Sequence, residues 1–227
     1  MFRLTKFLLL AIICLTIYIT FFGTYKKHSL YKTLEKTDRR IIALTFDDGP
    51  VDSTLDLLDS LSEVGIKAAF FVIGEEASKR PDVLQRIVQE GHIVGNHSWD
   101  HPHALGLRRK GFIENQIDKT NTIIKANTGK QAQYVRAPFG ESTPYSDFVI
   151  RQNNMIPVHW TLSFTDWKRS FTTEDLTRRF REIDRSEVIL LHDRAYQTPE
   201  MRKALVQAIQ ELQQRGYEFV TLDQVYF

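Results

Sequence analysis

The sequence predicts an α/β protein, built as a distorted or incomplete (β/α) barrel of about seven strands. Short apolar runs alternate with amphipathic helical patterns along most of the chain, an alternation typical of β/α folds. Titratable side chains follow several of these runs directly, as they do where β/α barrels assemble their sites. The chain after residue 38 is short for a full eightfold barrel of about 250 residues, which favours a reduced barrel.

Seven runs are predicted to be strands because they are mainly apolar and are bounded by turn residues. The first covers residues 41–46 and stops before Gly49 and Pro50. The remaining runs cover residues 68–73, 92–95, 133–136, 156–160, 188–192 and 218–222.

Helical spacing of apolar residues between these runs predicts five helices. Gly65, Gly91 and Gly216 directly follow three of them, and glycine is a common helix terminator. The predicted helices cover residues 53–64, 82–90, 112–127, 173–183 and 199–215.

The N-terminus differs from the rest of the chain. Residues 7–25 are uncharged and mostly apolar, and at 1.5 Å per residue they can cross a bilayer core of about 30 Å. The absence of an obvious small-residue cleavage site favours an uncleaved signal anchor over residues 1–25. Similar positive charge on its two sides leaves the orientation open. We predict a linker over residues 26–38 and one globular domain over 39–227.

Composition narrows the class of protein. With 42% hydrophobic and 26% charged residues, the chain is neither disordered nor a multi-span membrane protein. A net charge of +2, with no basic cluster among aromatic residues, argues against a nucleic-acid partner. The single cysteine, Cys14, lies in the apolar segment, so no disulfide can form within the chain.

A carboxylate pair and a histidine pair form the strongest chemical signal. Asp47 and Asp48 follow the first predicted strand, and His97 and His101 are four residues apart. Zinc binds imidazole and carboxylate and keeps a position open for water at catalytic sites. Two histidines and one aspartate supply such a ligand set, and the second aspartate is left as a proton acceptor.

Both pairs need special local geometry. Neighbours on a strand point to opposite faces, so the turn at Gly49-Pro50 is expected to bring Asp47 and Asp48 together. The spacing of His97 and His101 predicts a helical turn that aims both imidazoles at one ion.

Three further segments place polar side chains after apolar runs. They contain Arg136 before a Pro/Gly turn, Asp166 next to Trp167, and His192 at the end of a strongly apolar strand. In order and spacing, the five segments resemble the signature segments of the polysaccharide deacetylase family, carbohydrate esterase family 4, which is built on a NodB-type domain. The resemblance covers roughly residues 39–227 and implies the same incomplete barrel.

The resemblance also implies roles for individual residues. Asp48, His97 and His101 match the metal ligands, and Asp47 matches the general base. The remaining matches are Arg136, which holds the base; Asp166, which orients the catalytic histidine; His192, the general acid; Trp167 and Leu190, which wall the acetyl pocket; and Phe139, whose neighbouring backbone amide helps to bind the oxyanion. Ser163 departs from the family pattern, in which an aspartate is common.

The implied function is metal-dependent removal of N-acetyl groups from an N-acetylglucosamine-containing polysaccharide or glycan, with Zn²⁺ as the expected ion. The alternatives are an O-acetyl esterase of plant or bacterial polysaccharide, a lipid-linked sugar deformylase and an inactive anchored glycan-binding domain. Two histidines and a carboxylate also suit non-haem iron, but that chemistry predicts an all-β jelly roll. The expected location is the cell membrane with the domain outside the cytoplasm, or secretion after signal cleavage. No protein partner is evident.

Overall fold

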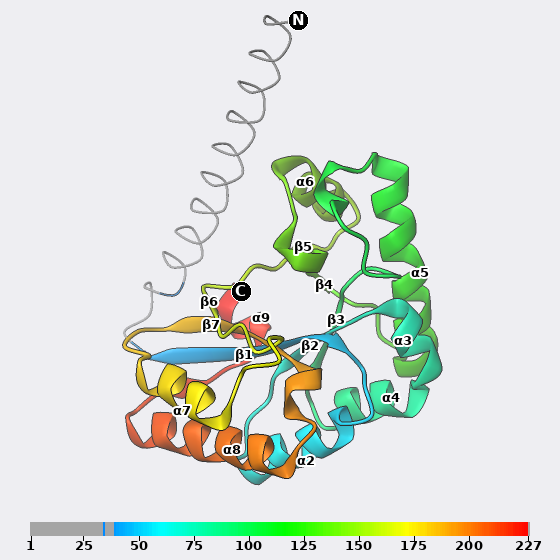
Figure 1. Cartoon of the computed structure of the whole chain (residues 1–227). Coiled ribbons are helices and arrows are strands. Elements are labelled where there is room, and N and C mark those ends of the chain that lie inside the picture. The colour runs from blue at the N-terminus through cyan, green and yellow to red at the C-terminus, as the bar shows by residue number, and fades with distance from the viewer. Residues whose placement is uncertain (1–33, 35–38, 227) are drawn as a thin grey trace, which may run out of the picture.

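A curled parallel sheet organises the chain. The computed structural model describes Leu34 and residues 39–226, and Figure 1 shows the sheet with helices packed along its outside. Its strands follow the order β5-β4-β3-β2-β1-β7-β6, and an eighth strand, β8, pairs with β1. The strands are β1 (Ile41–Gly49), β2 (Ala69–Val72), β3 (Ile93–Asn96), β4 (Tyr134–Val135), β5 (Ile156–Pro157), β6 (Leu162–Ser163), β7 (Glu187–His192) and β8 (Glu218–Phe219).

The helices lie between the strands in sequence, so the β/α alternation predicted from the sequence is confirmed. They are α2 (Thr54–Glu63), α3 (Gly74–Lys79), α4 (Pro81–Gln89), α5 (Lys110–Thr128), α6 (Pro144–Gln152), α7 (Thr173–Arg181), α8 (Pro199–Gln214) and α9 (Leu222–Tyr226). Three short 3₁₀ helices join them: η1 (Leu105–Leu107), η2 (Pro138–Gly140) and η3 (Asp193–Tyr196).

The two faces of the sheet bury separate hydrophobic clusters, because successive side chains on a strand point to opposite faces. On β1, Ile42 and Leu44 belong to the outer cluster, which includes apolar residues of α2 and α8. Ile41 and Ala43 belong to the inner cluster, together with Leu222 of α9. The interior of the curled sheet is therefore packed with side chains.

A short crossing segment joins the two edges of the sheet. The amide of Val158 still donates to Val135 O beside β5 (2.8 Å), and the amide of Thr161 already donates to Val188 O of β7 (2.9 Å). The strand predicted over residues 156–160 is therefore wrong in length, because the chain leaves β5 after Pro157 to cross the gap. The sequence prediction also lacked β6, which follows the crossing.

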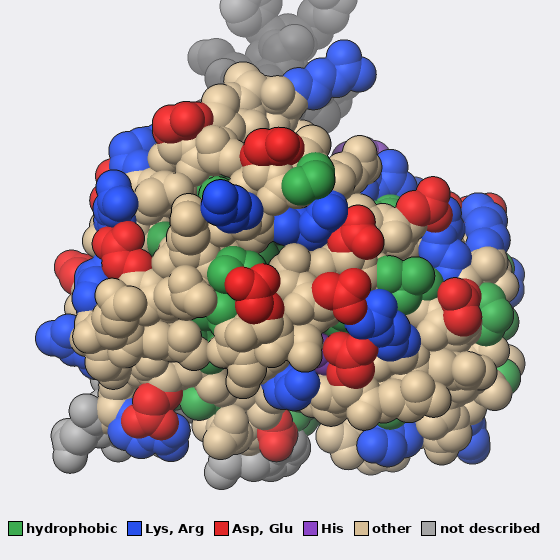
Figure 2. Space-filling view, turned by 90° about the horizontal axis from the view of Figure 1, so that it is seen from below, with side chains coloured by type: hydrophobic (Ala, Val, Ile, Leu, Met, Phe, Trp, Pro, Cys, Tyr) green, Lys and Arg blue, Asp and Glu red, His purple; other side chains and the backbone are tan. Residues whose placement is uncertain are grey.

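The underside of the molecule, as it is oriented in Figure 1, is polar. Figure 2 shows acidic and basic side chains interspersed over it, with only small hydrophobic areas. On α7 and α8 these charges form pairs such as Arg178 with Asp175 and Arg181 with Glu211. The large hydrophobic side chains exposed among the described residues lie instead in segments that follow strand ends: Leu107, Phe139, Tyr145, Phe148 and Trp167.

The predicted membrane anchor over residues 1–25 lies outside the described residues. Within the described part of the chain, no helix has both the length and the apolar character needed to cross a bilayer. Most of the predicted linker over residues 26–38 is also outside it. Leu34 is the exception, and its side chain is buried in the inner cluster.

Close packing of β3 on β2 yields a stability prediction. A Cβ atom at Gly95 would lie 2.6 Å from two ring carbons of Phe71, so Gly95→Ala forces that ring to move. We expect a loss of about 1–3 kcal/mol in the free energy of unfolding, the usual cost of overpacking. Urea denaturation measures it. Gly111→Ala is the control, because its Cβ would meet open space on α5, and it should stabilise by about 0.5–1 kcal/mol. Equal effects of the two substitutions would show that the contact with Phe71 carries no cost.

Candidate metal centre and active site

A one-residue irregularity in β1 brings both members of the aspartate pair to the site. The register with β2 runs from Asp47 opposite Phe71 directly to Gly49 opposite Val72, so Asp48 is an extra residue. Asp48 has φ 70°, a left-handed conformation that non-glycine residues rarely adopt. This β-bulge turns the Asp48 side chain away from the face that strand alternation would give it. From the sequence, we expected the turn at Gly49-Pro50 to bring the two aspartates together; the irregularity that does so lies one residue earlier, at Asp48.

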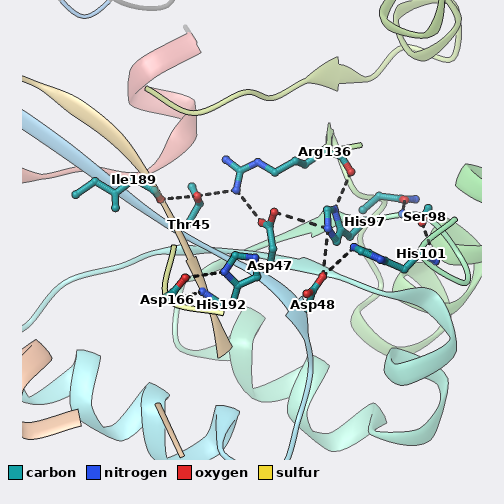
Figure 3. Close-up of polar contacts among 11 residues, drawn as sticks. Thr45, Asp47, Asp48, His97, Ser98, His101, Arg136, Asp166, Ile189 and His192 are labelled. Atoms are coloured by element: carbon teal, nitrogen blue, oxygen red, sulfur yellow. Dashed lines mark hydrogen bonds and ion pairs between the residues drawn. The ribbon is translucent and has the colours of Figure 1, made fainter. Parts of the chain in front are cut away.

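Asp48, His97 and His101 converge on one point, as Figure 3 shows. Asp48 Oδ1 lies 3.1 Å from His101 Nε2 and 3.4 Å from His97 Nε2. One possible ligand atom from each residue lies within 4.8 Å of the others. Although burial opposes its ionisation, the contacts with His101 and His97 hold the pKa of Asp48 well below its usual value.

The donor atoms of this cluster fit a divalent ion. Asp48 Oδ1 is buried without a hydrogen-bond partner, although it faces the two imidazoles. His97 Nδ1 lies 2.8 Å from Arg136 O, and a carbonyl can only accept, so Nδ1 carries the proton. The lone pair of His97 is therefore on Nε2, the atom that faces Asp48. Imidazole nitrogen with carboxylate oxygen suits a transition metal such as zinc.

The predicted helical turn over the two histidines is wrong. No helix is assigned between His97 and His101, and Ser98 (φ 68°) and His101 (φ 55°) are left-handed. Side chains take the backbone donors of this segment: Asn96 Oδ1 accepts from the Ser98 amide (2.9 Å), and Gln116 Oε1 accepts from the Trp99 amide (2.8 Å). The imidazoles converge because these bonds fold the loop.

Asp47 is held by a buried arginine. Arg136 Nη1 donates to Asp47 Oδ1 (2.7 Å) and to Thr45 Oγ1 (2.7 Å), and Thr45 in turn donates to Ile189 O (2.7 Å). The guanidinium also lies 4.2 Å from the centre of the Phe71 ring. Asp47 Oδ2 is 3.7 Å from His97 Nε2, so one carboxylate oxygen holds the arginine while the other faces the candidate metal position.

His192 is held in the same way by Asp166. Asp166 Oδ1 lies 2.8 Å from His192 Nδ1, and Oδ2 accepts from the His192 amide (2.8 Å). Burial alone would lower the pKa of His192, but the hydrogen bond and charge of Asp166, with the charges of Asp47 and Asp48, outweigh it and raise that pKa. Because a carboxylate accepts, Nδ1 carries a proton, and Nε2 is the atom left for a ligand.

One pocket of about 310 Å³ is lined by Asp47, Asp48, His97, His101 and His192. Its apolar wall contains Trp160, Trp167 and Leu190. Trp167 is 55% exposed at the rim, whereas Leu190 is 4% exposed inside. Phe139 is also at the rim, where its ring stacks on that of His103 with 3.9 Å between centroids. The structure thus brings together all ten residues singled out from the sequence.

Three residues near this pocket were not assigned a role from the sequence. Thr45 bridges Arg136 and β7, and its position two residues before Asp47 on the same strand face was the available signal. Trp160 packs over Gly140, where a Cβ would come within 2.4 Å of its ring. Asp193 is fully buried beside His192. Nothing in the sequence distinguished it from an exposed acid.

Metal binding can be measured without a substrate. Zinc at 100 times its dissociation constant should raise the free energy of unfolding by about 2.7 kcal/mol, because it binds only the folded chain. The His101→Ala variant should lose this gain. His103→Ala is the matched control, since the imidazole of His103 is 74% exposed and lies outside the cluster. Thermal unfolding with and without zinc gives the answer, and an undiminished gain in His101→Ala would exclude His101 as a ligand.

Comparison with known proteins identifies close relatives. The chain is 34% identical over 195 residues to the peptidoglycan-N-acetylglucosamine deacetylase of Bacillus cereus, covering 82% of this chain and 68% of that protein. It is 35% identical to the peptidoglycan-N-acetylmuramic acid deacetylase PdaC of Bacillus subtilis, covering 83% of this chain and 39% of PdaC. The chain thus spans about two fifths of the length of PdaC.

Solved structures give the same result. The fold superposes on the Bc1960 peptidoglycan N-acetylglucosamine deacetylase with a TM-score of 0.77 at 32% identity, covering 83% of this chain and 89% of that one. The family 4 carbohydrate esterase of Streptomyces lividans gives 0.71 at 28% identity, covering 78% and 90%. A sequence model described as polysaccharide deacetylase matches residues 34–158. The chain therefore belongs to the polysaccharide deacetylase family of enzymes, as its five segments predicted.

Proposed function

We propose that the chain removes N-acetyl groups from an N-acetylglucosamine-containing cell-wall polysaccharide, with Zn²⁺ as the resident ion. One observation carries the proposal: a carboxylate held by an arginine and a histidine held by an aspartate face the same pocket as the Asp-His-His cluster. Asp47 is paired with Arg136, and His192, its neighbour across β1 and β7, is paired with Asp166. An amide hydrolase needs both groups, because water must lose a proton and the leaving amine must gain one.

Asp47 is the general base of this proposal. Arg136 occupies Oδ1 and fixes the plane of the carboxylate, so Oδ2 is the atom that accepts the proton of the attacking water. A fixed orientation of the base lowers the barrier, because the water must attack along one direction. Asp47 then returns to its carboxylate form when the proton moves on to solvent or product.

His192 is the general acid. Its Nδ1 proton is bound to Asp166, so the proton that reaches the departing nitrogen comes from Nε2. Asp166 also binds the His192 backbone amide, which stops the ring from drifting along the pocket. Cleavage breaks the bond between the carbonyl carbon and nitrogen, and the products are acetate and the free amine. The amide near Phe139 would donate to the oxygen that becomes negatively charged.

The metal ligands of the proposal are Asp48, His97 and His101. When bound there, a divalent ion supplies Lewis acidity, which can lower the pKa of water from 15.7 to about 7. The choice of zinc rests on the two imidazole donors and the single carboxylate.

The apolar wall supports an acetyl group as the part of the substrate held in the pocket. Trp160, Trp167 and Leu190 give the pocket an apolar wall, and a methyl group gains free energy from losing contact with water there. An acetylated glycan fits both this wall and the exposed aromatic rim. Peptidoglycan is the polymer that we favour, since relatives of this chain are named for it.

We also propose that residues 1–25 form a signal anchor. Residues 1–25 would attach the enzyme to the cell membrane, with the catalytic domain outside the cytoplasm, where a cell-wall polymer is accessible. The alternative is secretion after cleavage. Detection of the full-length chain in washed membranes supports the anchor, and a shortened soluble chain supports cleavage.

Acetate release from defined substrates tests the reaction. The zinc-loaded enzyme should release acetate from peptidoglycan and from acetylated chitooligosaccharides. Asp47→Asn should retain zinc but lose about 10²–10⁴ in kcat, the usual contribution of a general base. His101→Ala should lose both zinc and turnover. Release from acetylated xylan alone would instead identify an O-acetyl esterase, and full activity of Asp47→Asn would remove the proposed base.

The pH dependence tests the acid. His192 acts in its protonated form, so kcat/KM should fall on the alkaline side as pH passes the raised pKa of this imidazole. In Asp166→Asn, the largest interaction that raises the pKa of His192 is lost while burial, which lowers that pKa, remains. The alkaline limb should therefore move to lower pH. NMR titration of the His192 ring reports the same shift without substrate. An alkaline limb that stays in place would assign it to another group.

A further inference from the structure

Asp193 is a buried acid that the proposed chemistry does not use. It follows His192 directly, begins η3 and is 0% exposed. Its Oδ1 atom is buried without a hydrogen-bond partner. Burial is the main cause that raises the pKa of this carboxyl to about 7. Burying such a group costs free energy that an apolar residue of similar size would not.

One contact of Asp193 reaches the loop that follows the bulge. Thr54 Oγ1 donates to Asp193 Oδ2 at 2.6 Å and accepts from the Val51 amide at 2.9 Å. Thr54 is the first residue of α2 and is itself fully buried. The Thr54 hydroxyl therefore connects the end of β7 to the backbone that leaves β1.

A second contact reaches the bulge itself. A Cβ atom at Gly49 would lie 2.2 Å from Asp193 Oδ2 and 2.7 Å from Cγ, so the carboxyl packs directly on the backbone of Gly49. The φ angle of Gly49 is not in the left-handed region. Glycine is required at this position by the contact with Asp193 rather than by backbone conformation.

The two contacts act on opposite ends of the same short segment. Gly49 follows the bulged residue Asp48, and Thr54 starts the helix beyond the turn. Asp48 is in a conformation that persists only where its surroundings hold it. On the other side, the backbone of Asp193 is continuous with His192. Movement of the carboxyl would thus change the position of Asp48 relative to His192.

We propose that Asp193 is a positioning residue that, together with Thr54, holds the bulge at Asp48 in register with His192. In this arrangement the metal ligand Asp48 depends on a residue that never touches the ion. The part concerning His192 rests on the proposed function, whereas the part concerning Asp48 rests on the metal cluster alone.

Zinc affinity, measured by competition with a chelator, tests the contact with Thr54. Thr54→Val keeps the shape and removes the hydroxyl, so zinc should bind about tenfold more weakly, the lower end of the loss seen when groups that bond directly to metal ligands are removed. Thr54→Ser restores the hydroxyl and should restore most of the affinity. Ile124→Val is the control: it removes a buried methylene from α5 and lowers stability, but should leave zinc affinity unchanged.

A double-substitution cycle tests the contact with Gly49. Gly49→Ala should weaken zinc binding because its new methyl collides with the Asp193 carboxyl. In the Asp193→Ala background that collision is absent, so adding Gly49→Ala should cause no further loss. Such non-additivity is expected for groups in contact or otherwise coupled, and not for distant, independent sites.

Two results would overturn the proposal. One is unchanged zinc affinity in Thr54→Val when the chain is folded, and the other is additive losses in the cycle. Neither measurement needs a substrate, so an enzyme that deacetylates no tested glycan would refute the proposed function without affecting this result. A loss of affinity in Ile124→Val as large as that in Thr54→Val would assign the effect to general stability and reject the positioning role.

Discussion

The bulge in β1 is the constraint on which the site depends. Adjacent residues on a regular strand point to opposite faces, so a regular β1 would direct either Asp47 or Asp48 into the helical layer. One extra residue with a left-handed backbone lets both carboxylates share a pocket. Asp47 stays on the face that carries Ile41 and Ala43, which is the interior of the sheet. The regular alternation of β1 therefore directs Asp47 into the pocket, and the bulge directs Asp48 there.

Two charge pairs at the pocket then support different proposed roles, one for the base and one for the acid. Arg136 neutralises Asp47, and Asp166 supports a proton on His192, so neither pair leaves an isolated charge in a buried site. The partner in each pair arrives from a different strand end, which is why curling the sheet matters. Strand ends far apart in sequence meet around one concave surface. The imidazoles of His97 and His101 complete it through a loop folded by side-chain hydrogen bonds.

Most strands and helices could be predicted from the spacing of apolar residues, because a long apolar run such as that of β7 fits few structures other than a buried strand. The shorter elements did not: β6 has two residues, and α6 begins with a capping box at Thr143 that carries little apolar signal. All ten candidate site residues were proposed from the order of the motifs, but the order did not predict their geometry. The helical turn at His97 failed because polar side chains took the backbone donors there. Asp193 was not found because burial of an acid depends on distant contacts.

A crystal structure of the zinc-loaded protein, with anomalous data collected at the zinc edge, tests the central claim most directly. One anomalous peak is expected about 2.0–2.2 Å from Asp48 Oδ1, His97 Nε2 and His101 Nε2. Asp47 should remain on Arg136, outside the first coordination sphere. Zinc bound by Asp47 in place of Asp48, or a regular β1 without the bulge, would contradict the account.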